Sequence, residues 1–352
     1  MAGSALEGER AVTLVLRVGA RYSARVSRRT LVIGGVLLAA SVALAVWSMT
    51  MGDFELGIDE VVGALLGTGS AKAHLVVVEW RLPRVLLALA VGAALGLSGA
   101  IFQSLTRNPL GSPDIIGFNT GAYTGAILVL VLIPHNGWMV AGGAMIGGIL
   151  TAALVYALAW RRGVHGFRLI IVGIAVSAVL ASLNTWLLLV VDLQQAMGAA
   201  IWGAGTLNGV GWDQFFTVLL VAAVLLPAMI ALAPRMRLLE MGDDAASSLG
   251  VDAEKSRLQL VLVGVALTAV CTAVAGPISF VALAAPQLAR RLTRSPGIAL
   301  VPSAMLGALL LLASDVIAQR AFAPTQLPVG IITVALGGGY LIWLLIREAR
   351  RN

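Results

Sequence analysis

The chain has 352 residues, of which 59% are hydrophobic and 12% are charged, and its mean hydropathy is +0.95. Soluble globular domains carry about a quarter charged residues, so this composition excludes an ordinary soluble protein and indicates a membrane protein. The single cysteine, Cys271, excludes a disulfide framework and a cysteine-based metal site. We expect no metal ion and no other cofactor on this chain.

The apolar segments predict an all-α polytopic membrane protein with about ten transmembrane helices. A bilayer core of ~30 Å is crossed by about 20 apolar residues in a helix. The predicted spans are 31–51, 84–105, 114–134, 139–160, 169–191, 215–233, 258–275, 279–293, 302–321 and 329–346. The eighth span is short, and only Gly276-Pro277 separates it from the seventh.

The distribution of basic residues predicts the orientation. Of the 24 Lys and Arg residues, all but Lys72, Arg81, Arg84 and Arg320 fall on the side of the N-terminus. Because cytoplasmic loops carry the excess of Lys and Arg, both termini are predicted to be cytoplasmic. The net charge of +7 therefore reflects membrane topology, which excludes nucleic acid as a partner.

These spans define one transmembrane domain with two short tails. Residues 1–30 form a basic cytoplasmic N-terminal tail, 31–346 the membrane domain, and 347–352 a cytoplasmic C-terminal tail. An inner loop, 234–257, joins spans six and seven.

Two arginines precede the second span on the outer side, in the sequence R-L-P-R from Arg81 to Arg84. Their position runs against the positive-inside bias. The planar guanidinium group of arginine binds carboxylates well, so these residues are candidates for contact with a docking protein. The alternative is that their side chains anchor the helix at the membrane interface.

Gly96-Leu97-Ser98-Gly99 in the second span matches the sequence around the nucleophile of intramembrane serine proteases. A nucleophilic serine needs a base within hydrogen-bond distance. The histidines (His74, His135 and His165) all fall in loops, so the sequence favours a small-residue packing face over an enzyme.

The connection between spans two and three is unusually polar, with the sequence T-R-N-P-L-G-S-P-D-I-I-G-F-N-T-G-A from Thr106 to Ala122. Pro109 and Pro113 disfavour helix in the residue before each of them. Asp114 is predicted to cap the third span by accepting its free amide protons. We interpret the segment as a tight re-entry into the membrane.

The inner loop 234–257 contains a candidate docking surface. Asp243 and Asp244 begin an Ala- and Ser-rich stretch that Gly250 ends, which predicts a short helix. A second short helix is predicted from Asp252. A solvated amphipathic loop is the alternative.

Asp315 is the one clear ionisable residue in the interior of a span. A secondary transporter needs such residues to bind coupling ions, but a single aspartate is more often a structural carboxylate bonded to a neighbouring helix. The chain contains no G-x-x-x-x-G-K-[S/T] sequence, so an ATP-driven transporter would need its ATPase on another chain.

Several sequence blocks resemble the permease subunits of bacterial iron-siderophore and vitamin B12 ABC importers. The first block begins with R-L-P-R-V-L-L-A-L-A and ends with R-N-P-L-G-S-P-D-I-I-G. The amino-acid sequences of that block and of L-L-E-M-G-D-D are most similar to those of subunits that carry ferric catecholate siderophores. The matching blocks lie at 81–117, 241–251, 276–291 and 326–338.

The resemblance implies a multi-pass permease of the bacterial plasma membrane, with two pseudo-symmetric halves, that carries a ferric siderophore. It also implies a second permease subunit, identical or homologous, two copies of a cytoplasmic ATPase that bind ATP and Mg, and an extracytoplasmic siderophore-binding protein. Cobalamin or haem is the alternative cargo within the family, and an ion-coupled secondary transporter is the alternative mechanism.

The resemblance assigns residues to three tasks. ATPase coupling falls on Glu240, Gly242, Asp243, Asp244, Ala246, Leu249 and Gly250, and binding-protein docking on Arg81, Arg84 and Arg320. The family's third docking arginine aligns with Gln319, one helical step of about 100° from Arg320. A family histidine is replaced by Gln287, which argues against an essential imidazole there. Candidate pathway residues are Asn184, Thr185 and Thr333.

Overall fold

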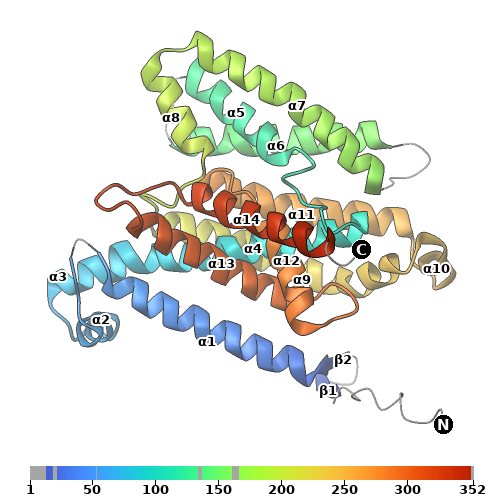
Figure 1. The fold of residues 1–352 in the computed structure, drawn as a ribbon, viewed down its shortest axis with the longest axis horizontal. Helices are drawn as coiled ribbons and strands as arrows, with labels where there is room; N and C mark the ends of the chain where they lie inside the picture. Colours follow the sequence, from blue (N-terminus) through green and yellow to red (C-terminus); the bar gives the residue numbers. More distant parts are fainter. Residues whose placement is uncertain (1–12, 19–21, 53, 134–136, 161–165, 350–352) are drawn as a thin grey trace.

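The computed structural model describes residues 13–18, 22–52, 54–133, 137–160 and 166–349, and in these ranges the chain is almost entirely helical (Figure 1). The N-terminal half comprises α1 (Arg28–Thr50), α2 (Ile58–Leu65), α3 (Ala71–His74), the π-helical turn η1 (Leu75–Arg81), α4 (Leu82–Thr106), α5 (Phe118–Leu132), α6 (Gly137–Ala159) and α7 (Gly166–Val190). The C-terminal half comprises α8 (Leu193–Gly203), α9 (Trp212–Glu240), α10 (Asp243–Ser248), α11 (Ala253–Ala275), α12 (Val281–Thr293), α13 (Leu300–Arg320) and α14 (Val329–Ala349).

Each predicted span coincides with one of these helices. Among the described residues, seven helical segments are long and apolar enough to cross a membrane, and α5 and most of α14 are shorter apolar helices. The eighth predicted span, α12, has 13 residues and falls in neither group. The third predicted span begins late, as α5 at Phe118, because the preceding polar connection is not helical. The helix predicted from Asp252 is the first turn of α11, with Asp252 as its N-cap.

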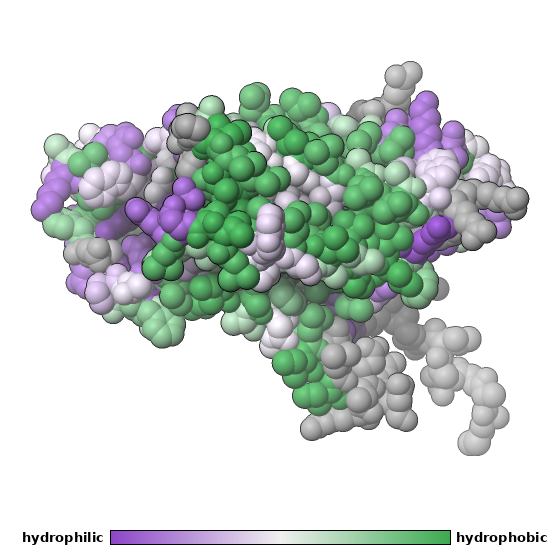
Figure 2. All heavy atoms as spheres, turned by 90° about the horizontal axis from the view of Figure 1, so that it is seen from above, coloured by the Kyte–Doolittle hydropathy of each residue, from purple (hydrophilic) through white to green (hydrophobic). Residues whose placement is uncertain are grey.

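The helices form layers around α4. In the most apolar 18 residues of the helical run Ala71–Thr106, 78% of the residues are buried. The corresponding share is 11% in α7 and 17% in α1 and α9. Figure 1 shows α4 in the middle layer with α13, between α1 on one side and the layer of α5 to α8 on the other. The exposed sides of the outer helices form the apolar band across the middle of the face in Figure 2, with hydrophilic residues gathered at both ends. This distribution matches a bilayer between two aqueous phases.

Small residues allow α4 to approach its neighbours closely. A Cβ added at Gly92 would overlap the carbonyl oxygen of Gly307 in α13, and one added at Gly99 would overlap the carbonyl group of Ala282 in α12. Ser98 lies on the same helix, fully buried, and its hydroxyl donates to the carbonyl of Gly264 at 2.8 Å. This stretch of α4 is therefore a packing face, as the glycine spacing predicts.

The N-terminal tail contains a feature that the sequence did not predict. Strands β1 (Thr13–Val18) and β2 (Tyr22–Ser27) form an antiparallel hairpin in which Thr13 pairs with Ser27. The Ser27 hydroxyl then accepts from the amide of Thr30 at 3.1 Å and caps α1. The all-α prediction for the membrane protein is confirmed, and the hairpin adds a small strand pair in the tail, for which the sequence predicted no secondary structure. His135 and His165 lie outside the described residues, as do residues 1–12 and 350–352.

Replacing Gly99 by Ala will destabilise the packing of α4 against α12. The added methyl group would meet the backbone of Ala282, which has no rotamer to change, so we expect a loss of about 1–3 kcal/mol of stability. Thermal unfolding of the detergent-purified protein measures the effect. Gly35→Ala in α1 is the matched control, because nothing lies within 4 Å of its added Cβ; an equal midpoint for both variants would contradict this packing.

Candidate functional site

The coupling segment predicted on the inner side is a short helix bounded by two glycines of positive φ. Gly242, the N-cap of α10, has φ 122° and ψ 154°, a conformation open essentially to glycine alone. Gly250 has φ 80°, and the amides of Gly250 and Val251 donate to the carbonyls of Ser247 and Ala246. This pair of bonds is the Schellman arrangement that ends a helix, so the predicted Gly-ended helix is confirmed.

The predicted coupling residues divide into an exposed group and an anchored group. Asp244 and Leu249 are exposed, and Leu249 shows 61% of its surface. Ala246 is fully buried, and the Glu240 carboxylate accepts from the Ser104 hydroxyl at 2.9 Å. The exposed group is available to a cytoplasmic partner, whereas the anchored group fixes α10 to the membrane domain.

Asp243, at the start of α10, lies between two arginines. Its Oδ1 pairs with Arg107 Nη2, and both of its oxygens accept from Arg257 Nη2, at 2.8 and 2.9 Å. Burial raises the pKa of Asp243, but the hydrogen bonds and charges of Arg257 and Arg107 outweigh burial and hold the pKa below its ordinary value. The carboxylate is therefore ionised at neutral pH. Sequence reasoning missed both partners: Arg107 is 136 residues from Asp243, and Arg257, 14 residues away, is brought to the carboxylate only by the fold of the inner loop.

The polar connection between α4 and α5 is fixed by bonds to α12. Asp114 accepts from the backbone amide of Phe280, the N-cap of α12, at 3.1 Å and from Asn119 Nδ2 at 2.8 Å. The prediction that Asp114 caps α5 is therefore wrong, since its backbone partner belongs to α12. Gln287 Nε2 donates to the carbonyl of Pro109 at 2.6 Å, so this side chain supports the re-entry that the sequence predicted.

At the outer end, Arg84 is the centre of a polar network. Its guanidinium donates to both carboxylate oxygens of Asp315, at 2.9 and 3.0 Å, and to Asn208 Oδ1 at 2.8 Å. Asp315 is 1% exposed and also accepts from Gln319 Nε2. This geometry confirms the interpretation of Asp315 as a structural carboxylate bonded to a neighbouring helix.

The other two predicted docking arginines have different surroundings. Arg81 donates to the carbonyls of Met49 and Phe54 and so joins the end of η1 to the last turn of α1 and to the segment that follows it. Arg320 is partly exposed at the end of α13 and forms no ion pair with another described residue. Gln319, at the aligned family position, is turned inward to Asp315.

A polar cavity of about 280 Å³ opens between α5, α7 and the segment before α12. Asn184 and Thr185, both predicted, line it, together with Asn119, Thr120, Tyr123 and Ser279. Asn119 and Asn184 each have a buried amide oxygen without a hydrogen-bond partner among the described residues. The third candidate, Thr333, is buried, and its hydroxyl donates to the carbonyl of Gly330 in its own helix.

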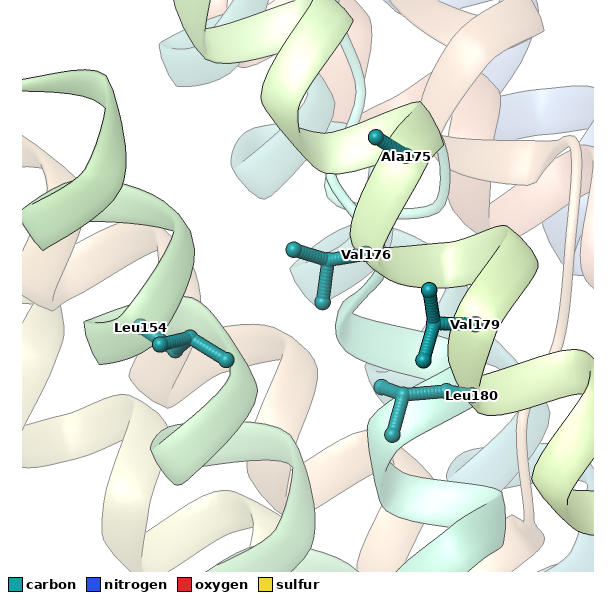
Figure 3. Close-up of a pocket in the computed structure, with 5 residues that line it drawn as sticks. All are labelled: Leu154, Ala175, Val176, Val179 and Leu180. Carbon is teal, nitrogen blue, oxygen red and sulfur yellow. The ribbon is translucent and has the colours of Figure 1, made fainter.

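A second hollow, of about 250 Å³, lies between α6 and α7 (Figure 3). The side chains that line it are Leu154, Ala175, Val176, Val179 and Leu180, all apolar. They offer no hydrogen bond to a polar solute, so this groove fits a lipid-facing surface. The described residues contain no group of three or more His, Cys, Asp or Glu side chains that could hold a metal ion.

Comparison with known proteins finds similarity over nearly the whole chain. The model of the FecCD transport family matches residues 37–347. The ferric enterobactin transport system permease protein FepG of Escherichia coli K12 is 52% identical over 93% of this chain and 99% of that protein. The iron(3+)-hydroxamate import system permease protein FhuG of Bacillus subtilis is 35% identical over 91% and 98%.

A haem permease and a solved structure extend the comparison. The hemin transport system permease protein HmuU of Yersinia pestis is 35% identical over 90% of this chain and 96% of that protein. A solved metal-chelate type ABC transporter in an inward-facing conformation superposes with a TM-score of 0.79 at 27% identity. It covers 90% of this chain and 99% of that one.

Replacing Asp315 by Asn will destabilise the outer end of the protein. The variant leaves the Arg84 guanidinium, which is 15% exposed, without its paired carboxylate. Breaking a buried pair in this way costs on the order of 3 kcal/mol. Thermal unfolding checks the prediction, with Glu55→Gln in the exposed outer loop as the control; a midpoint for Asp315→Asn that equals the control would show that the pair does not stabilise the fold.

Proposed function

Because the chain belongs to the FecCD transport family, we propose that it carries a ferric siderophore of the catecholate type across the bacterial plasma membrane. It is a multi-pass permease component of an ABC importer and not an enzyme. The observation that carries the cargo proposal is the 52% identity to the ferric enterobactin permease, against 35% to the hydroxamate and haem permeases.

The same comparison defines the competing cargo. A haem permease is as similar to this chain as a hydroxamate permease, so membership of the family alone does not select a siderophore. Cobalamin is the further alternative. An uncharged cavity wall lets an anionic ferric complex pass without trapping it, which suits a cargo that a separate protein binds and delivers.

The geometry at Asp315 argues against ion-coupled transport. A coupling site needs an ionisable group that gains and loses its ion during the cycle. Both oxygens of Asp315 are engaged by Arg84, and Gln319 donates a further bond. A carboxylate held in this way is a structural element, which favours energy supplied from outside the membrane domain.

The energy comes, in this proposal, from two copies of a cytoplasmic ATPase that bind ATP and Mg. The exposed surface of α10, with Asp244 and Leu249, is where they dock. The second permease subunit packs on the exposed side of α5 and α7 and closes the cavity that contains Asn184 and Thr185 into a tunnel. Thr333 has less support as a pathway residue, because its hydroxyl is bonded within α14.

The binding protein docks at the outer mouth. Arg81, Arg84 and Arg320 all lie at this end of the molecule, and guanidinium groups pair well with carboxylates. Arg84 and Arg81 already bond to their own chain, so they present a fixed rather than a mobile positive charge. Arg320, partly exposed and without an ion pair among the described residues, has the most freedom to meet a partner.

Uptake of radiolabelled iron complexes in cells that lack this chain tests the cargo. We expect ferric catecholate uptake to be lost and to return when the chain is restored, while cobalamin and haem uptake continue. Unchanged uptake of every ferric siderophore, together with lost uptake of haem or cobalamin, would contradict the siderophore proposal and select the alternative.

Gly250→Trp will abolish coupled uptake while the protein inserts and folds normally. Nothing lies within 4 Å of a Cβ at Gly250, so the new side chain projects from the docking surface and blocks the ATPase. The positive φ adds only about 1–2 kcal/mol of backbone strain. Uptake in membranes with matched expression measures the effect.

Gly67→Trp is the control for Gly250→Trp, because Gly67 has φ 75°, equally open surroundings and a position after α2 at the outer end. It carries the same backbone strain without touching the inner surface. Wild-type uptake by Gly250→Trp would remove α10 from the docking surface.

A further inference from the structure

The end of α4 is bonded at three points to the end of α9 and the start of α10. The Ser104 hydroxyl donates to Glu240, Arg107 Nε donates to the carbonyl of Leu239 at 3.1 Å, and Arg107 Nη2 pairs with Asp243. More than 130 residues separate the two sides along the chain. The Arg107 side chain therefore bonds the inner end of α4 both to the last turn of α9 and to the start of α10.

The backbone at Arg107 is strained. This residue ends α4 with φ 48° and ψ 33°, the left-handed conformation that residues with a Cβ rarely adopt. Such a conformation persists where the surroundings hold it in place. The bonds of the Arg107 side chain to Leu239 and Asp243 supply that restraint, so the course of the α4–α5 connection, residues 107–117, depends on them.

The two arginines on Asp243 differ in exposure. The Arg257 side chain, in the first turns of α11, is 10% exposed and bonds both carboxylate oxygens. The Arg107 side chain is 46% exposed. Arg257 is thus the fixed partner that keeps Asp243 on α11, and Arg107 is the partner that can separate from the carboxylate at little desolvation cost.

The α4–α5 connection leads from Arg107 to the wall of the polar cavity. Its Pro109 carbonyl accepts from Gln287 of α12, and Asp114 accepts from Phe280 and from Asn119. Asn119 lines the cavity. A continuous path of covalent and hydrogen bonds therefore runs from α10, through Arg107, to a residue that faces the cargo.

We propose that Arg107 is the positioning residue that transmits the movement of α10 to the α4–α5 connection and thus to the cavity. This inference rests on the proposed function, in which an ATPase moves α10. A partner drives a conformational change only by binding its two states differently. Arg107 links the segment that the ATPase contacts to the segment that shapes the cavity, and Arg257 keeps Asp243 bonded to α11 while α10 moves.

The test uses the complete transporter in proteoliposomes, with a readout that does not depend on the cargo. Cys271 is the only cysteine and is buried, so a Thr185→Cys substitution in the exposed part of the cavity provides one reactive site for a fluorescent label. We expect ATP to change the label's emission in the otherwise unaltered protein. In Arg107→Gln, ATP hydrolysis continues and the emission change falls by about fivefold to 100-fold, the range typical of coupling between sites.

Two further variants distinguish a loss of transmitted movement from a loss of protein stability. Arg235→Gln removes an exposed arginine of α9 whose side chain bonds Gln259, and this control keeps the full emission change. Arg107→Lys retains the charge opposite Asp243 and recovers part of the response. Because Arg107 acts through Asp243, the double variant Arg107→Gln/Asp243→Asn is no worse than the stronger single variant.

Two outcomes would overturn the inference: an emission change in Arg107→Gln within about twofold of the control, below the range typical of coupled sites, or a parallel fall of emission change, hydrolysis and unfolding midpoint. The uptake of labelled ferric siderophore is read separately, in proteoliposomes of the transporter that retains Thr185 and carries no fluorescent label. If the labelled complex shows the emission change but the unlabelled complex moves no ferric siderophore, the proposed cargo is contradicted and the role of Arg107 stays supported.

Discussion

In the hydrocarbon core no water completes the hydrogen bond of a peptide group, so every interruption of a helix has to be completed by the protein itself. This constraint acts most strongly where α5 and α12 begin. The free amide of Phe280 is met by the Asp114 carboxylate, and the free carbonyl of Pro109 by the Gln287 amide. The polar residues of the α4–α5 connection are therefore required by the two helix breaks that they join.

The same constraint explains where the charged residues lie. Asp243 pairs with Arg107 and Arg257 at the inner end, and Asp315 pairs with Arg84 at the outer end. Between these two clusters the cavity is lined by amides and hydroxyls such as Asn184 and Thr185. The proposed pathway is therefore neutral between two electrostatically fixed ends, which suits a passive route driven by a partner.

The sequence predicts features that depend on neighbours along the chain. Hydrophobic length alone predicts ten segments, and each coincides with a helix of the described structure; the prediction of 31–51 compares with α1 at Arg28–Thr50. The acidic start and the final glycine likewise placed α10. Features that depend on distant pairs were missed: Arg84 and Asp315 are 231 residues apart, and Asp114 and Phe280 are 166 apart. Asp114 was assigned to α5 because the sequence shows only the nearest helix.

ATP-driven movement of a ferric siderophore through this chain is the central claim. The most direct measurement is uptake of a labelled ferric catecholate by proteoliposomes that contain the complete transporter, with ATP and with a protonophore varied independently. We expect uptake that requires ATP and is unchanged when the protonophore removes the proton gradient. Uptake that continues without ATP and stops with the protonophore would contradict it.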